Sequence, residues 1–128
     1  LQDILSHAEQ AGFGDLHFKI DKATGLCAII AIHSTKNGPA LGGCRCIEYY
    51  QTADAVYDAM RLARGMSYKA IMADVPHGGG KAVLIKPRDI PDRRAYFLAF
   101  GRFVQELNGR YITAVDSGST IEDMDVIS

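Results

Sequence analysis

Residues 65–85, GMSYKAIMADVPHGGGKAVLI, decide the fold of this 128-residue chain. A helical pattern leads into the glycine run Gly78–Gly80, and the apolar, β-prone run Ala82–Ile85 follows at once. The pattern predicts a helix, a glycine-rich loop that lets a ligand approach the backbone, and a buried strand. We expect Lys81 at the mouth of that strand and Lys69 on the helix that leads to the loop.

The two lysines give this stretch its chemical interest. Two ammonium groups in one half-closed crevice repel each other, so at least one of them should lose its proton more readily than a free lysine does. A lysine that titrates near the working pH can act as an acid or a base, while a lysine that stays charged can hold a carboxylate. The pair Lys69 and Lys81 therefore predicts half of an active site.

Working outward, alternating periodicities predict further elements on both sides. The expected elements are a helix over 4–11, a hairpin of strands over 16–20 and 26–33, a strand around 44–49, helical segments over 52–63 and 67–73, a helix begun by Pro91 and Asp92, a strand over 111–115 and a helix from Thr120. Within these, Thr52 is the expected N-cap, and Leu16, Phe18 and Ile20 form the expected buried face of the first strand.

This order of elements predicts an α/β fold, a mixed β-sheet flanked by helices on both faces. Ligands of such sheets bind at the carboxyl ends of the strands, so the loops 38–43, 76–81 and 116–119 are expected to meet there. Asp116 lies in the last of these loops and is a candidate acid or a plain turn residue.

Composition limits the class of protein. With 48% apolar residues the chain can bury a core as one domain, 1–128, and 14 basic against 15 acidic residues leave a net charge of −1. We therefore expect no nucleic-acid partner, whereas a small anion remains possible. No apolar run approaches the roughly 20 residues of a membrane span, and no signal peptide is present, so a cytoplasmic location is expected. Both ends look cut, which suggests a domain of a longer protein.

The cysteines and the glycines each allow a more specific interpretation, a metal site and a nucleotide-binding loop respectively. Cys27, Cys44 and Cys46 are expected to be reduced structural thiols, and a metal site of Cys44, Cys46 and His77 has no supporting ligand spacing. The run HGGGKA lacks the serine or threonine that a phosphate loop needs after its lysine, and a strand follows it where a dinucleotide-binding turn would open a helix. The sequence thus contains no recognisable nucleotide-binding motif.

Several motifs in order resemble the N-terminal domain of the Glu/Leu/Phe/Val amino-acid dehydrogenases, and most closely the leucine, phenylalanine and valine enzymes. The matching segments are GPALGGCR, LARGMSYKAIMADVPHGGGKAV, AFGRFVQELNGRYITAVDSG and TIEDMD. The resemblance runs from about Gly38 to Asp125. It implies NAD-dependent, reversible oxidative deamination of an L-amino acid to a 2-oxo acid and ammonia, with a C-terminal NAD-binding Rossmann domain outside this segment and self-association through the present domain.

The resemblance also assigns roles by position. It implies that Lys69 binds the substrate carboxylate, that Lys81 is the acid/base that activates water, and that Asp116 takes part in proton transfer to and from the amino group. Leu41, Gly42, Gly43 and Met66 should line the substrate pocket. No cofactor-binding or metal-binding residue is expected in this segment, and the isolated domain should be inactive.

Leu41 separates the candidate substrates. Glutamate-specific relatives carry a lysine at this place in the loop to meet the side-chain carboxylate, and an apolar group there would leave that charge desolvated and unpaired. A branched-chain or aromatic amino acid is therefore expected, and glutamate is disfavoured. The alternative is a non-catalytic module of the same fold that binds carboxylates or mediates oligomerisation.

Overall fold

The computed structural model describes residues 3–127 and contains a five-stranded sheet in the order β1-β2-β4-β3-β5. The strands are β1 (Asp15–Asp21), β2 (Leu26–Ser34), β3 (Ala40–Ile47), β4 (Gly78–Ile85) and β5 (Tyr111–Val115). β2 pairs antiparallel with β1 and β4, while β3 runs parallel to β4 and β5. The predicted mixed sheet is confirmed.

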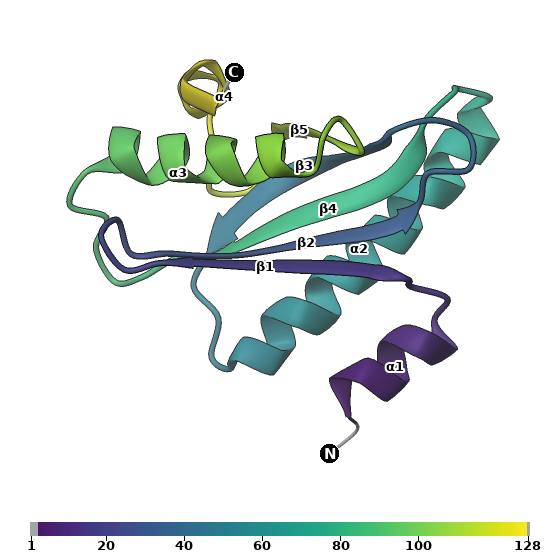
Figure 1. Ribbon diagram of the computed structural model, residues 1–128, viewed down its shortest axis with the longest axis horizontal. Coiled ribbons are helices and arrows are strands. Elements are labelled where there is room, and N and C mark those ends of the chain that lie inside the picture. Colours follow the sequence, from purple (N-terminus) through teal and green to yellow (C-terminus); the bar gives the residue numbers. More distant parts are fainter. Residues whose placement is uncertain (1–2, 128) are drawn as a thin grey trace.

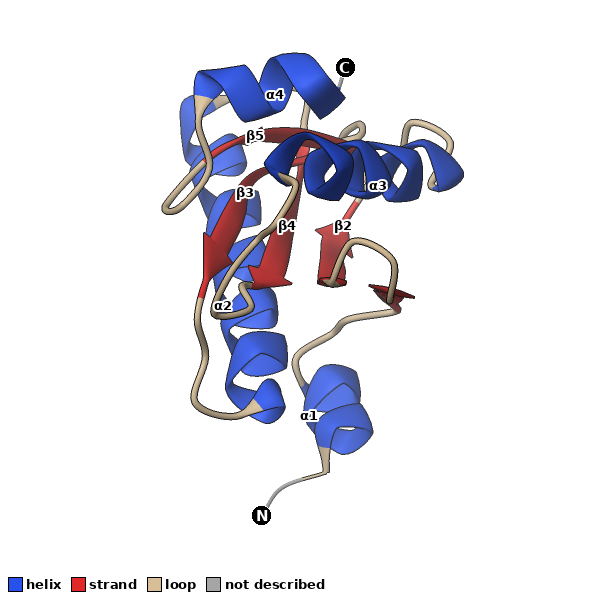
Figure 2. Cartoon of the chain, turned by 90° about the vertical axis from the view of Figure 1, so that its left-hand side faces the viewer, coloured by secondary structure: helices blue, strands red, loops and turns tan. Residues whose placement is uncertain are grey.

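Helices cover both faces of this sheet, as the alternation of elements predicts. The helices are α1 (Ile4–Gln10), α2 (Thr52–Ala73), α3 (Arg93–Glu106) and α4 (Ile121–Ile127). Figure 1 shows α3 and α4 on one side of the strands and α1 and the long α2 on the other, and Figure 2 shows the same layers after a quarter turn. Among the described residues, no helix combines the length and the apolar character that a bilayer span needs.

Alternating strand residues divide the apolar core in two. In β2, Ile30 points to the core beneath α3, and its neighbours Ile29 and Ala31 point to the core beneath α2. β4 alternates in the same way, because Leu84 joins the α3 core and Val83 joins the α2 core. A central strand buried on both faces explains why the run after Lys81 is continuously apolar.

Two strands begin earlier than the sequence predicts. β3 starts at Ala40 and β4 at Gly78, so the expected glycine-rich loops are strand segments. Glycine usually weakens a strand, but here neighbouring backbone and side-chain atoms fill the space that a side chain would need, and this close packing overrides the local preference. Lys81 consequently lies inside β4 and not at its mouth.

The expected meeting of three loops at the carboxyl ends of the strands is wrong for the same reason. The segments before β3 and β4 lie together at the amino ends of these strands, where the amide of Gly78 donates to the carbonyl of Pro39 (2.9 Å). The segment after β5 lies at the other end, where the amide of Cys46 donates to the carbonyl of Ser117 (2.8 Å).

Local differences from the sequence predictions occur at α2 and β1. α2 is one continuous helix through Gly65, and Gln51 occupies the N-cap position predicted for Thr52. Of the predicted buried face of β1, Leu16 packs against the core beneath α2, but the prediction is wrong for Phe18 and Ile20, which are 55% and 72% exposed. β1 is an edge strand, so the alternation of apolar residues does not mark a face that is covered along its whole length.

Candidate functional site

A cleft of about 540 Å³ lies between α2 and the strands β3, β4 and β5. The seven residues that the sequence singles out all line it. They are Leu41, Gly42 and Gly43 of β3, Met66 and Lys69 of α2, Lys81 of β4, and Asp116 just after β5. The sheet floor brings together residues that are far apart in the chain, because β3 pairs with both β4 and β5.

Lys81 is the most constrained cation of the cleft. Its residue partner in β2 is Ala31, which packs in the core beneath α2, so the side chain of Lys81 projects to the same side of the sheet as α2. Only 6% of the residue is exposed, and its Nζ forms an ion pair with Oδ2 of Asp116. A buried ammonium group needs such a partner, because an unpaired charge is expensive in a low-dielectric environment.

Gly43 leaves the space in which this ion pair forms. A Cβ atom at this position would lie 3.1 Å from Nζ of Lys81 and 2.8 Å from Cβ of Asp116. Any side chain at position 43 would therefore push the two charged groups apart. The glycine is required by the ion pair, whatever else the cleft binds.

The glycines of β4 serve protein packing and do not leave room for a ligand. A Cβ atom on Gly78 would meet the carbonyl of Ser34, one on Gly79 would meet Ser67 of α2, and one on Gly80 would meet the ring of Tyr111. The glycine run therefore does not form the ligand-approach loop that the sequence predicts. Its function is to let β4 lie against its neighbours.

Asp116 is fixed by its own backbone surroundings. Its Oδ1 accepts from the amide of Ser117 (2.7 Å), and its amide donates to Oγ of Ser119 (3.0 Å), which donates to the carbonyl of Cys44 (2.6 Å). Burial alone would raise the pKa of Asp116, but the hydrogen bond from Lys81, the amide of Ser117 and the nearby cations hold it below its ordinary value. The carboxyl group is therefore ionised at neutral pH.

The opposite wall combines an exposed cation with apolar groups. Lys69 is exposed and forms no ion pair with an acidic residue of the described chain, so its charge is available to an incoming anion. Leu62 and Met66 of α2 face Leu41 and Val115 across the cleft. The arrangement can hold a small molecule that carries a carboxylate at one end and an apolar group at the other.

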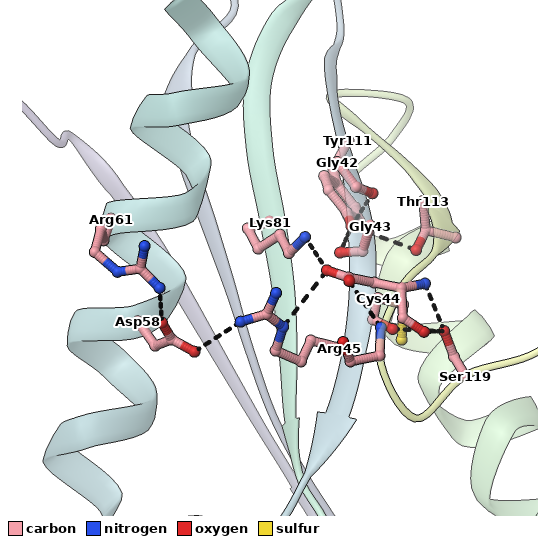
Figure 3. Close-up of polar contacts among 12 residues, drawn as sticks. Gly42, Gly43, Cys44, Arg45, Asp58, Arg61, Lys81, Tyr111, Thr113 and Ser119 are labelled. Atoms are coloured by element: carbon pink, nitrogen blue, oxygen red, sulfur yellow. Dashed lines mark hydrogen bonds and ion pairs between the residues drawn. The ribbon is translucent and has the colours of Figure 1, made fainter. Parts of the chain in front are cut away.

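The structure also brings in three charged residues that the sequence predictions omit, Arg45, Asp58 and Arg61. Arg45 lines the cleft, with Nε 3.6 Å from Oδ2 of Asp116 and Nη1 3.4 Å from Oδ2 of Asp58 on α2. Figure 3 shows Arg45 between Asp58 and Lys81. The sequence feature that could have identified Arg45 is the period of two in β3, which places Leu41, Gly43 and Arg45 on one face of the sheet.

The cysteines lie outside this chemistry. Cys44 and Cys46 are buried free thiols on the opposite face of β3, in the core beneath α3, and burial raises the pKa of the Cys44 thiol far above its ordinary value. Residues 3–127 contain no group of three or more potential metal ligands, and the alternative with His77 finds no support in this arrangement.

Comparison with known proteins identifies the family that the sequence motifs resemble. The family model described as Glu/Leu/Phe/Val dehydrogenase, dimerisation domain, matches residues 13–128. A valine dehydrogenase of Streptomyces albus is 51% identical over 97% of this chain and 34% of its own length, and a leucine dehydrogenase of Geobacillus stearothermophilus is 50% identical over 98% and 34%.

A solved structure agrees with these matches. The crystal structure of L-tryptophan dehydrogenase from Nostoc punctiforme superimposes with a TM-score of 0.92 at 41% identity, covering 98% of this chain and 37% of that one. The chain thus spans about a third of the length of the curated relatives it matches.

Proposed function

This chain belongs to the Glu/Leu/Phe/Val dehydrogenase family, and we propose that it is the substrate-binding half of an NAD-dependent L-amino-acid dehydrogenase. The reaction is the reversible oxidative deamination of a branched-chain or aromatic L-amino acid to a 2-oxo acid and ammonia. The single observation that carries this proposal is the cleft, in which two lysines and an aspartate face apolar side chains.

Each charged group has a part that suits its surroundings. Lys69, exposed and without an acidic partner in the described chain, binds the α-carboxylate of the substrate. Lys81, buried beside Asp116, donates and accepts the proton of the water that attacks the imine carbon. Asp116, which is held ionised, exchanges a proton with the substrate nitrogen.

The apolar wall selects the side chain of the substrate. Leu41, Leu62 and Met66 offer no partner for a second carboxylate, which would lose its hydration on entering. An aliphatic or aromatic side chain instead gains from the same transfer. Glutamate is therefore the disfavoured substrate.

NAD does not fit the residues of this chain as a primary site. Its pyrophosphate requires a glycine turn that opens a helix, but the glycines of β4 lie inside a strand against Ser34, Ser67 and Tyr111. We therefore place the main NAD site in a separate Rossmann domain outside residues 1–128, and we expect this domain alone to be inactive. Bound there, NAD would supply the hydride acceptor of the proposed reaction.

We also propose self-association through this domain in the cytoplasm. The matching family model is described as a dimerisation domain, and the edge strand β1 exposes Phe18 and Ile20, as an interface would require. The three free thiols suit a reducing compartment. Sedimentation of the complete gene product at monomer mass would contradict the assembly, and Ile20→Glu should weaken it.

The test of the function is an assay of the complete gene product with a panel of L-amino acids and 2-oxo acids. Lys81→Ala should lower kcat by about 10²–10⁴-fold, because a general acid/base is lost, whereas Lys69→Ala should mainly raise KM. Lys22→Ala, an exposed lysine of the β1–β2 turn, is the matched control and should leave both constants unchanged. Retention of most activity in Lys81→Ala would overturn the assignment.

The competing function is a non-catalytic module that binds carboxylates. It predicts that the complete wild-type protein binds a 2-oxo acid, with a loss of binding in Lys69→Ala, and shows no turnover with any member of the panel. Turnover with L-glutamate in preference to apolar substrates would instead favour the glutamate-type enzyme.

A further inference from the structure

Arg45 connects the cleft to helix α2 through a row of alternating charges. Starting at the cleft, the row runs from Lys81 to Asp116, Arg45 and Asp58, and it ends at Arg61. Figure 3 shows Arg61, Asp58, Arg45 and Lys81 in this order, with dashed lines along the row. Its members come from β3, β4, α2 and the segment after β5, so the row crosses the floor of the cleft and reaches its wall.

The guanidinium of Arg45 contacts a carboxylate at both ends, but not all of its N–H groups form hydrogen bonds with residues that the structure describes. Nη1 donates to Oδ2 of Asp58 at 3.4 Å, while Nε lies 3.6 Å from Oδ2 of Asp116 and makes no hydrogen bond within the described part of the chain. The Arg45 side chain is 22% exposed and that of Asp58 is 16% exposed. In such partly buried surroundings an ion pair is screened less than on an open surface.

Asp58 is itself fixed, and this fixes Arg45. The hydroxyl of Tyr49 donates to Oδ2 of Asp58 (2.5 Å), and Nη2 of Arg61 donates to its Oδ1 (2.6 Å). Burial would raise the pKa of Asp58, but these two hydrogen bonds and the charge of Arg45 lower it. The Asp58 carboxylate is therefore a permanent anchor for Nη1.

Arg45 and Lys81 share one oxygen of Asp116 but differ in chemistry. A lysine that serves as an acid and a base loses its proton during each cycle, and it then stops compensating the Asp116 charge. A guanidinium keeps its proton at any physiological pH, so its charge stays beside Asp116 throughout. Arg45 can thus keep the carboxylate ionised and aimed at the cleft while Lys81 changes its state.

We propose that Arg45 is a positioning residue of this site, which holds the Asp116 carboxylate opposite Lys81 and keeps it ionised, and that Asp58 holds Arg45 in place. The inference rests on the proposed function, since it assigns Asp116 a proton-transfer role. It adds a residue pair that acts through Asp116, without requiring contact between Arg45 and the reacting atoms.

The groups facing Asp116 define what a pH profile reports. They are Lys81 of β4 and Arg45 of β3, with Lys69 and Arg61 of α2 on the cleft wall. On the other face of β3, the buried thiol of Cys44 and Asp123 of α4 also lie within electrostatic range. Replacing either arginine leaves the proposed acid/base and the carboxylate-binding lysine intact, and within the described chain it is Arg45, not Arg61, that pairs with Asp116.

The first test is the pH dependence of kcat/KM for the complete gene product with its best apolar substrate. Arg45→Met should move the acid limb upward by about one pH unit, because a cation near the carboxylate is lost, and should lower kcat about tenfold with KM changed less than threefold. Arg45→Lys should keep the limb near its wild-type position with a smaller loss of kcat. Arg88→Met, the same change at an exposed arginine, is the control.

Asp58→Asn separates an electrostatic role from a merely structural one. Removing this negative charge leaves Arg45 free to turn to Asp116, so the acid limb should move to lower pH. A structural role predicts the same loss of kcat in Arg45→Met and Asp58→Asn without opposite movement of the limb, and that result would overturn the proposal. A KM raised tenfold at unchanged kcat would also overturn it, because Arg45 would then bind the substrate.

A stability readout keeps this inference separate from the proposed function. If the wild-type protein lacks activity, the proposed function fails, but Arg45 and Asp116 can still be compared through a thermal double-mutant cycle. The unfolding midpoint of Arg45→Met with Asp116→Asn should fall by less than the sum of the single variants at pH 7. Additive midpoints would show that the two residues are uncoupled and would end the proposal.

Discussion

The two faces of the sheet are built from the same strands but have opposite properties. Beneath α3 the alternate residues of β2, β3 and β4 form a closed apolar core that includes the fully buried rings of Tyr96, Phe97 and Phe100. Beneath α2 the core is smaller and ends beside the cleft, because α2 packs mainly on β4 and β2 and makes far fewer contacts with β3. The face beneath α3 thus contributes mainly apolar burial to stability, whereas the face beneath α2 gives up part of this burial to hold the charged groups of the cleft.

Among the changes that test this difference between the two faces, substitution of adjacent glycines in β4 should have the largest effect on stability. Gly79 faces α2, and a Cβ there would meet the backbone of Ser67 and Ala63, whereas a Cβ on Gly80 would meet the ring of Tyr111 at 2.9 Å and Ala40 at 3.0 Å. Gly79→Ala should lower the free energy of unfolding by at least about 3 kcal/mol, and Gly80→Ala by about 1–3 kcal/mol.

Chemical denaturation of both variants measures the difference. Gly65→Ala is the matched control, since a Cβ at that position in α2 has no neighbour within 4 Å, and Ala favours a helix over Gly by roughly 1 kcal/mol. Equal losses in the Gly79 and Gly80 variants would mean that α2 can shift as easily as an aromatic ring.

Acid should destabilise the charged face, and the sign follows from Asp58 and Asp116. Both carboxyls have pKa values below the ordinary value when folded, so the unfolded chain binds more protons as the pH falls. Their contribution is present above about pH 4, and it is lost as the pH drops through the folded pKa values. The unfolding midpoint of Asp116→Asn should therefore depend less on pH between 5 and 3 than that of the wild type.

Thermal unfolding at several pH values checks this expectation. Asp92→Asn serves as the control, because Asp92 is an exposed helix cap of α3 outside the charged row. A pH dependence in Asp116→Asn that parallels the wild type would show that the ion pair with Lys81 adds no stability.

Removal of the Tyr111 hydroxyl should have the smallest effect, and it tests the apolar core beneath α3. The Tyr111 hydroxyl is buried and donates to the carbonyl of Gly42 (2.7 Å), so Tyr111→Phe should cost about 1–2 kcal/mol. Tyr96→Phe is the matched variant, since the hydroxyl of Tyr96 contacts only the weak donor Sγ of Cys46 at 4.0 Å among the described bonds. A larger loss for Tyr96→Phe in urea unfolding would reverse the expected order.

Much of the fold is predictable from local patterns, and the failures share a cause. α3 and β5 occur where the periodicity and the cap Asp92 predict them, and the helices on both faces of a mixed sheet are confirmed. The starts of β3 and β4 are not predictable in this way, since contacts with atoms distant in the sequence explain the glycines inside these strands. The exposure of Phe18 and Ile20 likewise depends on which strand lies at the edge of the sheet, which no local pattern reveals.

The residues of the candidate site also differ in whether the sequence predicts them. Lys69, Lys81 and Asp116 carry charged groups that the sequence itself singles out, the family resemblance adds the four pocket-lining residues, and all seven line the cleft. Arg45 and Asp58 are different, because thirteen positions separate them and their pairing requires β3 and α2 to pack together. Sequence patterns identify the groups that perform chemistry more readily than those that hold them.

The place of Lys81 in the sheet has a consequence for motion. Its backbone belongs to a central strand with β2 on one side and β3 on the other, so its amide should exchange with solvent hydrogen only when much of the domain opens. If Lys81 is the proton carrier that we propose, this anchoring leaves it little freedom to travel toward its reactant. Any closure that excludes bulk water in the proposed reaction must then be made by the parts that cover the cleft, moving against a stationary Lys81.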